Sequence, residues 1–199
     1  ELLVTLGKAY VAEANRSEEA EEAADRMHEA RKQLSRASEL VGPDHPLQWL
    51  VTLLLAEIDH HDGDLESARR RYAEVVEHYS FADGRPAALL GLAEVEAQIN
   101  NIEARGTPED ALQHYEEVVG LFASSEFTAL DRERVGGSLI RRFKEQYEKG
   151  AYPAALRFAG LAERLYNEDE APAELLLALA EVHKRLAEDL LRSAKSGGL

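Results

Sequence analysis

The residues with the clearest potential for chemistry are six consecutive positions at the end of an apolar segment. Positions 59–64 read Asp-His-His-Asp-Gly-Asp and offer five metal-binding side chains. Neighbouring side chains on a helix diverge by about 100°, however, and metal sites are usually assembled from residues four apart or from separate elements. The alternative is a helix that ends at the histidines, whose partial positive charge suits the negative end of the helix dipole, followed by an N-capping Asp64. We favour this alternative and predict no metal and no other cofactor.

Carboxylates are the second candidate for chemistry. Glu18, Glu19, Glu21 and Glu22 form the densest run, but a charge run on a helix is ordinarily a solvated face. The sequence has no glycine-rich phosphate loop, no HExxH and no GxSxG motif. It also has no cysteine, which excludes thiol catalysis, disulfides and cysteine metal sites. We therefore predict that the chain is not an enzyme.

Composition defines the fold class and limits the partners. Apolar residues make up 45% of the 199 residues, and the abundant Ala, Leu, Glu and Arg are strong helix formers. The net charge of −15 disfavours nucleic acid and anionic lipid as partners. The richest apolar run, 47–58, is too short to span a membrane, which takes about 20 residues. Arg outnumbers Lys 17 to 6, which hints at a GC-rich bacterial coding sequence, and the compartment is left open.

Three segments of the chain repeat one pattern, and internal repeats of this kind indicate helical solenoids. Each segment has a glycine, an alanine five residues later and, in two of the three, a tyrosine four residues after that. The members are Gly63, Ala68 and Tyr72; Gly106, Ala111 and Tyr115; and Gly150 and Ala155, with Ala159 in place of the tyrosine. The glycines are 43 and 44 residues apart. A glycine past a helix end can adopt the left-handed conformation, and Asp64 or Thr107 followed by Pro108 can begin the next helix.

These residues resemble the tetratricopeptide repeat, in which two antiparallel helices pack closely around the small alanine. The period here is about ten residues longer than that family's usual one. The resemblance implies an all-α solenoid of about four helix hairpins with a C-terminal capping helix. The expected helices span 1–15, 17–41, 46–62, 65–80, 86–104, 108–123, 129–149, 151–167 and 172–195. We predict a single domain over 1–195 with a flexible tail at 196–199. Because the amphipathic pattern begins at Glu1, we expect this domain to be a fragment of a longer protein.

The resemblance also implies a binding surface, because first helices of such pairs line a concave groove. Transferred by position, the predicted partner-binding residues are Leu50, Leu53, Glu57, His60, His61, Asn100, Arg141, Lys144 and Tyr147. Between Asp131 and Lys149 there are six cations and four carboxylates, a local excess of positive charge in an acidic chain. Our hypothesis is that Arg141 and Lys144, flanked by Ile140 and Tyr147, hold an acidic group of a partner peptide. The alternative, which we favour slightly, is that these cations pair with carboxylates of neighbouring helices.

Two adjacent glycines interrupt the same predicted helix. Gly136 and Gly137 would cost about 2 kcal/mol relative to alanine in a helix interior. Either the helix begins after them, with Ser138 as its cap, or they allow unusually close packing.

The predicted function is a protein–protein interaction scaffold that binds a peptide or domain of a partner. Self-assembly through a long helix such as 17–41, or an accessory role within a larger protein, are the alternatives. We expect a monomer or a weak homo-oligomer, with no membrane insertion by this segment.

Overall fold

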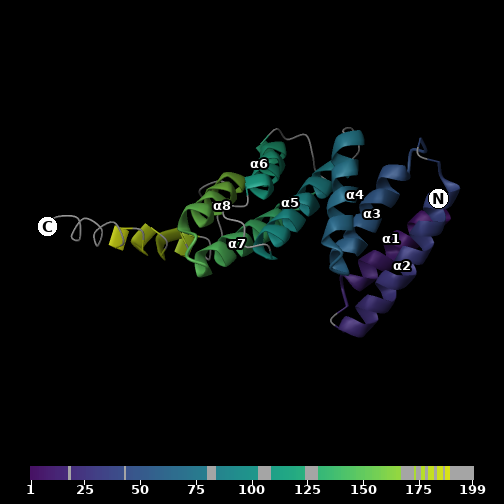
Figure 1. Cartoon of the computed structure of the whole chain (residues 1–199), viewed down its shortest axis with the longest axis horizontal. Helices are drawn as coiled ribbons and strands as arrows, with labels where there is room; N and C mark the ends of the chain where they lie inside the picture. The colour runs from purple at the N-terminus through teal and green to yellow at the C-terminus, as the bar shows by residue number, and fades with distance from the viewer. Residues whose placement is uncertain are drawn as a thin grey trace. The chain divides into compact units, whose positions relative to one another are not determined.

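The computed structural model describes residues 1–17, 19–42, 44–79, 84–102, 109–123, 130–166 and eleven positions between 173 and 188. Eight helices are bounded in these ranges, and no strand is present in them (Figure 1). They are α1 (Leu2–Ala14), α2 (Ala20–Leu40), α3 (Gln48–His61), α4 (Leu65–His78), α5 (Arg85–Ile102), α6 (Glu109–Ala123), α7 (Arg132–Glu148) and α8 (Tyr152–Leu165). The predicted all-α fold of paired helices is confirmed, with boundaries within about three residues of those expected.

The helices fall into two compact units, residues 1–102 and 103–199. In the first unit each helix packs against the next one along the chain. In addition, α3 contacts both α1 and α5. In the second unit α8 packs against both α6 and α7. The expected third hairpin is thus divided, because α5 belongs to the first unit and α6 to the second. The described residues between 173 and 188 are helical, as predicted, and the tail at 196–199 lies outside the described residues.

Two adjoining hydrophobic clusters hold the first unit together. One joins α1, α2 and α3 around the buried side chains of Met27, Leu34 and Ile58. The other joins α3, α4 and α5, with Tyr72 at its centre. Tyr72 has room because it faces Gly91, where any Cβ atom would collide with the tyrosine ring. The aromatic residue of the repeat is therefore a packing residue, as its helical spacing indicated.

The turn of the repeat is also formed as expected. Gly63 has φ +80° and Gly150 has φ +74°, the left-handed conformation that closes a helix without a Cβ penalty. Asp64 caps α4 by accepting a hydrogen bond from the Ser67 amide at 3.2 Å. The small residues Ala68, Ala111 and Ala155 are fully buried. The corresponding turn at Gly106, with Thr107 and Pro108, lies outside the described residues.

No helix in the described part of the chain is both long enough and apolar enough to cross a membrane.

Candidate functional site

The predicted partner-binding residues are distributed over both units. Six belong to the first unit: Leu50, Leu53, Glu57, His60 and His61 on α3, and Asn100 on α5. The other three, Arg141, Lys144 and Tyr147, belong to α7 in the second unit.

Among the α3 residues, two serve mainly in packing. Leu53 is only 6% exposed and lies in the core between α3, α4 and α5. Leu50 is half-buried against the core of α1, α2 and α3. Burial leaves Leu53 almost no surface with which to contact a partner.

The polar residues of α3 also have neighbours within the unit. His60 is half-buried, with its Nε2 2.8 Å from Nε2 of Gln98 on α5 and its ring edge-on to Tyr72. His61 is exposed, with Nδ1 3.1 Å from a carboxylate oxygen of Asp62. Glu57 and Asn100 are half-buried, and each interacts with another part of the chain. The contacts of His60 join α3 to α4 and α5.

The acidic segment at 59–64 forms an ion-pair cluster, and Asp59 is at its centre. The Asp59 side chain is only 3% exposed, and its two carboxylate oxygens accept hydrogen bonds from different helices. Arg31 of α2 donates from Nη1 at 2.6 Å, and Arg71 of α4 donates from Nε at 2.7 Å. Arg31 also donates from Nη2 to Asp62 at 2.9 Å. One buried carboxylate thus connects α2, α3 and α4.

The same geometry separates the side chains that the sequence had suggested as metal ligands. Asp59 points inward to two arginines, His60 to Gln98, and Asp64 to the first turn of α4. In the ranges that the structure describes, no three His, Asp or Glu side chains are grouped closely enough to hold a metal ion. Desolvation raises the pKa of Asp62, but hydrogen bonds from His61 and Arg31 outweigh it, so its pKa is lowered overall. The segment is built for ion pairing among helices.

Local sequence patterns contain only a weak signal of this cluster. Asp59 lies four residues after Leu55 and eight after Val51, which places it on the buried face of α3. Its partners Arg31 and Arg71 are 28 and 12 residues away, and only the packing of the helices brings them together. The pairing could therefore not be read from local spacing.

In the second unit, α7 presents one continuous exposed stripe. Its members alternate at intervals of three and four residues, which places them on one line along the helix. They are Arg134, Gly137, Arg141, Lys144 and Glu148. The stripe has three cations, one carboxylate and no apolar side chain. Arg134 and Lys144 are ten residues apart, about 15 Å along the helix axis.

The cations of α7 differ in their environments. Arg142 is only 3% exposed on the buried face of α7, and its Nη1 donates to Glu145 at 2.7 Å. This pair lies within α7, so it does not test the alternative that the cations pair with carboxylates of neighbouring helices. Arg141 and Lys144 are exposed, and each also interacts with a residue of the chain. Because both side chains are exposed, a partner's carboxylate would compete with these interactions.

The two adjacent glycines of α7 have opposite surroundings. The helix begins at Arg132 with Asp131 as its cap, which excludes the alternative in which it starts after the glycines with Ser138 as cap. Asp131 accepts from the Glu133 amide, and Ser138 is instead buried with its hydroxyl 2.7 Å from that of Tyr115. Gly136 is buried where a Cβ atom would collide with the ring and hydroxyl of Tyr166. Close packing is thus the reason for Gly136, whereas a Cβ at Gly137 would meet no atom of the described part of the chain within 4 Å.

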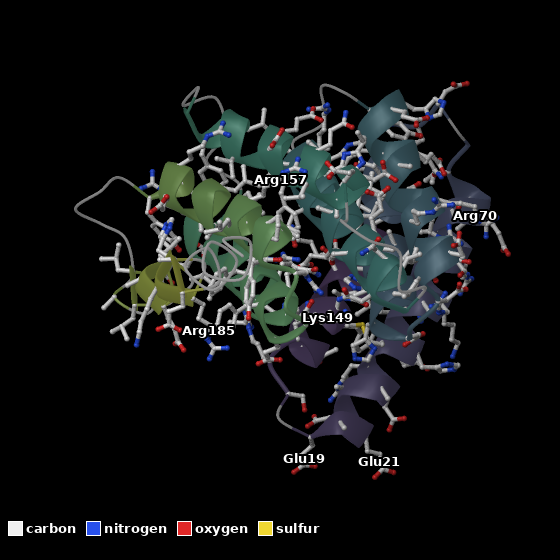
Figure 2. The ribbon with its side chains drawn as sticks, turned by 60° about the vertical axis from the view of Figure 1, so that its left-hand side comes forward. Glu19, Glu21, Arg70, Lys149, Arg157 and Arg185 are labelled. Atoms are coloured by element: carbon white, nitrogen blue, oxygen red, sulfur yellow. The ribbon has the colours of Figure 1, made fainter. Side chains whose placement is uncertain are left out.

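Tyr147 belongs to an aromatic cluster beside the stripe. Its ring stacks on Phe143 with centroids 6.0 Å apart and lies 5.6 Å from the ring of Tyr152. The guanidinium of Arg185, labelled in Figure 2, lies 5.1 Å from the Tyr147 centroid. Desolvation raises the pKa of the Tyr147 hydroxyl, and the positive charge of Arg185 opposes this shift. The carboxylate of Glu181 accepts a hydrogen bond from the Tyr147 hydroxyl at 3.2 Å and raises its pKa further. Tyr147 therefore packs the C-terminal helical residues onto α7.

Other charged residues are tied to local packing or lie in solvent. Arg157 of α8, labelled in Figure 2, donates to both carboxylate oxygens of Glu109 at 2.7 and 2.6 Å and so ties α8 to the start of α6. Glu19 and Glu21 project from the first turn of α2 into solvent, as a solvated charge run should (Figure 2).

No protein family, no curated protein and no solved structure is significantly similar to the chain. The likeness to tetratricopeptide repeats therefore remains a prediction from the repeated residues.

Proposed function

We propose that the chain is a protein-binding module that recognises a segment of another protein through an exposed helix face. The observation that carries this proposal is the stripe on α7, where Arg134, Arg141 and Lys144 are exposed in a chain of net charge −15. A helix face of this kind is an interaction surface of the type used for acidic motifs. Stacked helix hairpins also present such faces on a rigid support, which limits the entropy lost on binding.

Affinity capture from a lysate of the source organism tests the proposal. The wild-type chain would be compared with an Arg141→Glu/Lys144→Glu variant of equal helicity, and each captured protein would be purified and titrated against both chains. A protein that binds the wild-type chain with a defined stoichiometry supports the proposal. If no captured protein binds the purified wild-type chain directly, the proposal fails.

Self-assembly is the second candidate, and exposed leucines favour it. Leu2 is 80% exposed and Leu6 38% exposed, one helical turn apart on α1, and Leu40 at the end of α2 is 71% exposed. Large apolar side chains that gather on one surface often mark association sites. Light scattering over a range of concentrations separates the candidates, since a stable oligomer supports self-assembly and a concentration-independent monomer excludes it.

A further inference from the structure

The stripe on α7 has a feature that packing does not explain, namely the open position at Gly137. A glycine inside a helix lowers stability relative to alanine. Gly136 is required because Tyr166 occupies the space beside it, but no atom of the described residues lies within 4 Å of a Cβ placed on Gly137. Gly137 lies midway between Arg134 and Arg141, so the stripe has a gap with no side chain between two guanidinium groups.

We infer that this stripe binds an acidic, extended peptide segment of a partner protein, with the partner's backbone passing over Gly137. The inference rests on the proposed function and deepens it by naming the surface and the chemistry of its partner. The charge of the stripe selects carboxylates, which guanidinium groups bind through short, charge-assisted hydrogen bonds. The missing side chain lets a peptide backbone approach the helix closely, a common use of glycine at binding surfaces.

The spacing of the cations fits an extended segment. Arg134 and Arg141 are separated by seven residues, about 10 Å along the helix. In an extended chain of the polyproline II type, which repeats every three residues, carboxylates three residues apart lie on the same side and are separated by a similar distance, at about 3.1 Å per residue. An amphipathic helix is a poorer fit, because helix-in-groove recognition depends on apolar anchors and the stripe has no apolar side chain.

The net charge of the chain does not prevent this binding. At physiological ionic strength the Debye length is about 8 Å, so an acidic segment on the stripe interacts mainly with the charges beside it. These are the three cations, the carboxylate of Glu148, and the nearby carboxylates of Glu133 and Glu145, of which Glu145 already pairs with Arg142. Arg141 and Lys144 each already interact with a residue of the chain, and because both side chains are exposed, the peptide's carboxylates would compete with these interactions.

A defined peptide tests the inference on the intact chain. The probe is a blocked, fluorescein-labelled peptide of four glutamate-serine-glycine repeats, and its control carries glutamine in place of glutamate. Binding is measured by fluorescence anisotropy and located by amide chemical shifts in NMR spectra. We expect the glutamate peptide to bind, to shift the amides of α7 around Gly137, and to lose about tenfold or more in affinity with Arg134→Gln/Arg141→Gln. No binding, equal binding of the glutamine peptide, or shifts outside α7 would overturn the inference.

The glycine gives a separate test that does not alter charge. Gly137→Ala should raise the Tm of the chain by about 2–4 °C, because alanine favours the helix and meets no neighbouring atom. It should nevertheless weaken binding of the glutamate peptide severalfold by closing the gap. Gly120→Ala is the matched control, since Gly120 is an exposed glycine with open space on α6. It should raise the Tm similarly and leave peptide binding unchanged. Unchanged binding by Gly137→Ala would contradict the role of the glycine.

The two proposals can fail separately. A partner protein that binds the wild type, Arg134→Gln/Arg141→Gln and Gly137→Ala chains equally would keep the binding function and refute the α7 surface. Absence of any direct partner, together with absence of peptide binding, would refute both.

Discussion

The buried carboxylate of Asp59 allows a prediction in which one substitution changes sign with its background. In the wild-type chain, Asp59→Ala removes the hydrogen bonds from Arg31 at 2.6 Å and from Arg71 at 2.7 Å. In a chain that already carries Arg31→Ala and Arg71→Ala, the same substitution removes a buried carboxylate that has lost both of these arginines. The first change should destabilise the first unit, and the second should stabilise it.

The magnitudes follow from burial. Hydrogen bonds to charged groups contribute about 1.5–3 kcal/mol each. The side chains of Arg31 and Arg71 are 34% and 38% exposed, so after Asp59→Ala both can be solvated, and we expect a loss of about 2–3 kcal/mol in total. Removing both arginines leaves the Asp59 side chain, only 3% exposed, without either cation, and such a loss costs about 3–5 kcal/mol. Adding Asp59→Ala to that variant should therefore raise the free energy of unfolding by about 1–2 kcal/mol, because an unpaired carboxylate is no longer desolvated on folding.

The assay is urea denaturation followed by tryptophan fluorescence. Trp49 is the single tryptophan of the chain and lies on α3, so its emission reports the unfolding of the first unit. Arg69→Ala is the control, because Arg69 is an exposed neighbour on α4 that pairs with Glu66; we expect a change below about 0.5 kcal/mol. An equal destabilisation by Asp59→Ala in both backgrounds would refute the account of the cluster.

Three further predictions concern single positions. Gly136→Ala should lower the free energy of unfolding by about 1–3 kcal/mol through overpacking, whereas Gly137→Ala should raise it by up to about 1 kcal/mol. Denaturation curves of the two variants that show stability changes of the same sign would contradict this. Asp62 has a lowered pKa, so the stability that its ionised form adds is fully present above about pH 5 and lost as the pH falls through that pKa. Asp62→Asn should thus be less stable than wild type at pH 7 and equally stable in acid; a gap that persists at pH 2 would exclude this cause. Tyr115→Phe should cost about 0.5–1.5 kcal/mol by removing the buried hydrogen bond to Ser138, and a double-mutant cycle with Ser138→Ala should show coupling between the two hydroxyls.

Local sequence patterns were sufficient to predict the helices and their turns. The turn glycines Gly63 and Gly150 adopt the left-handed conformation, and Tyr72 and Tyr115 are buried at the positions that helical spacing assigns to the core. These features depend on residues within about ten positions of one another, where helical periodicity and turn chemistry dominate.

The candidate site was less accessible to sequence analysis, because its features depend on which helices meet. The positive charge between Asp131 and Lys149 was visible, but not that Arg142 is buried and Arg141 exposed. The adjacent glycines left two explanations open. The need for Gly136 becomes clear only from the position of Tyr166, which is 30 residues away in the sequence. Arg134 did not appear among the predicted binding residues, although its spacing from Arg141 was a signal that could have included it.

The most direct test of the central claim, that α7 contacts a protein partner, is site-specific photo-crosslinking in the source organism. A photoreactive amino acid would replace Lys144 on the exposed stripe of α7 or, as a control, Glu163 on the exposed side of α8. We predict a discrete crosslinked protein from position 144 and none from position 163. The crosslink from position 144 should be lost when Arg134→Gln/Arg141→Gln is added. Equal adducts from both positions, or no adduct from position 144, would contradict the claim.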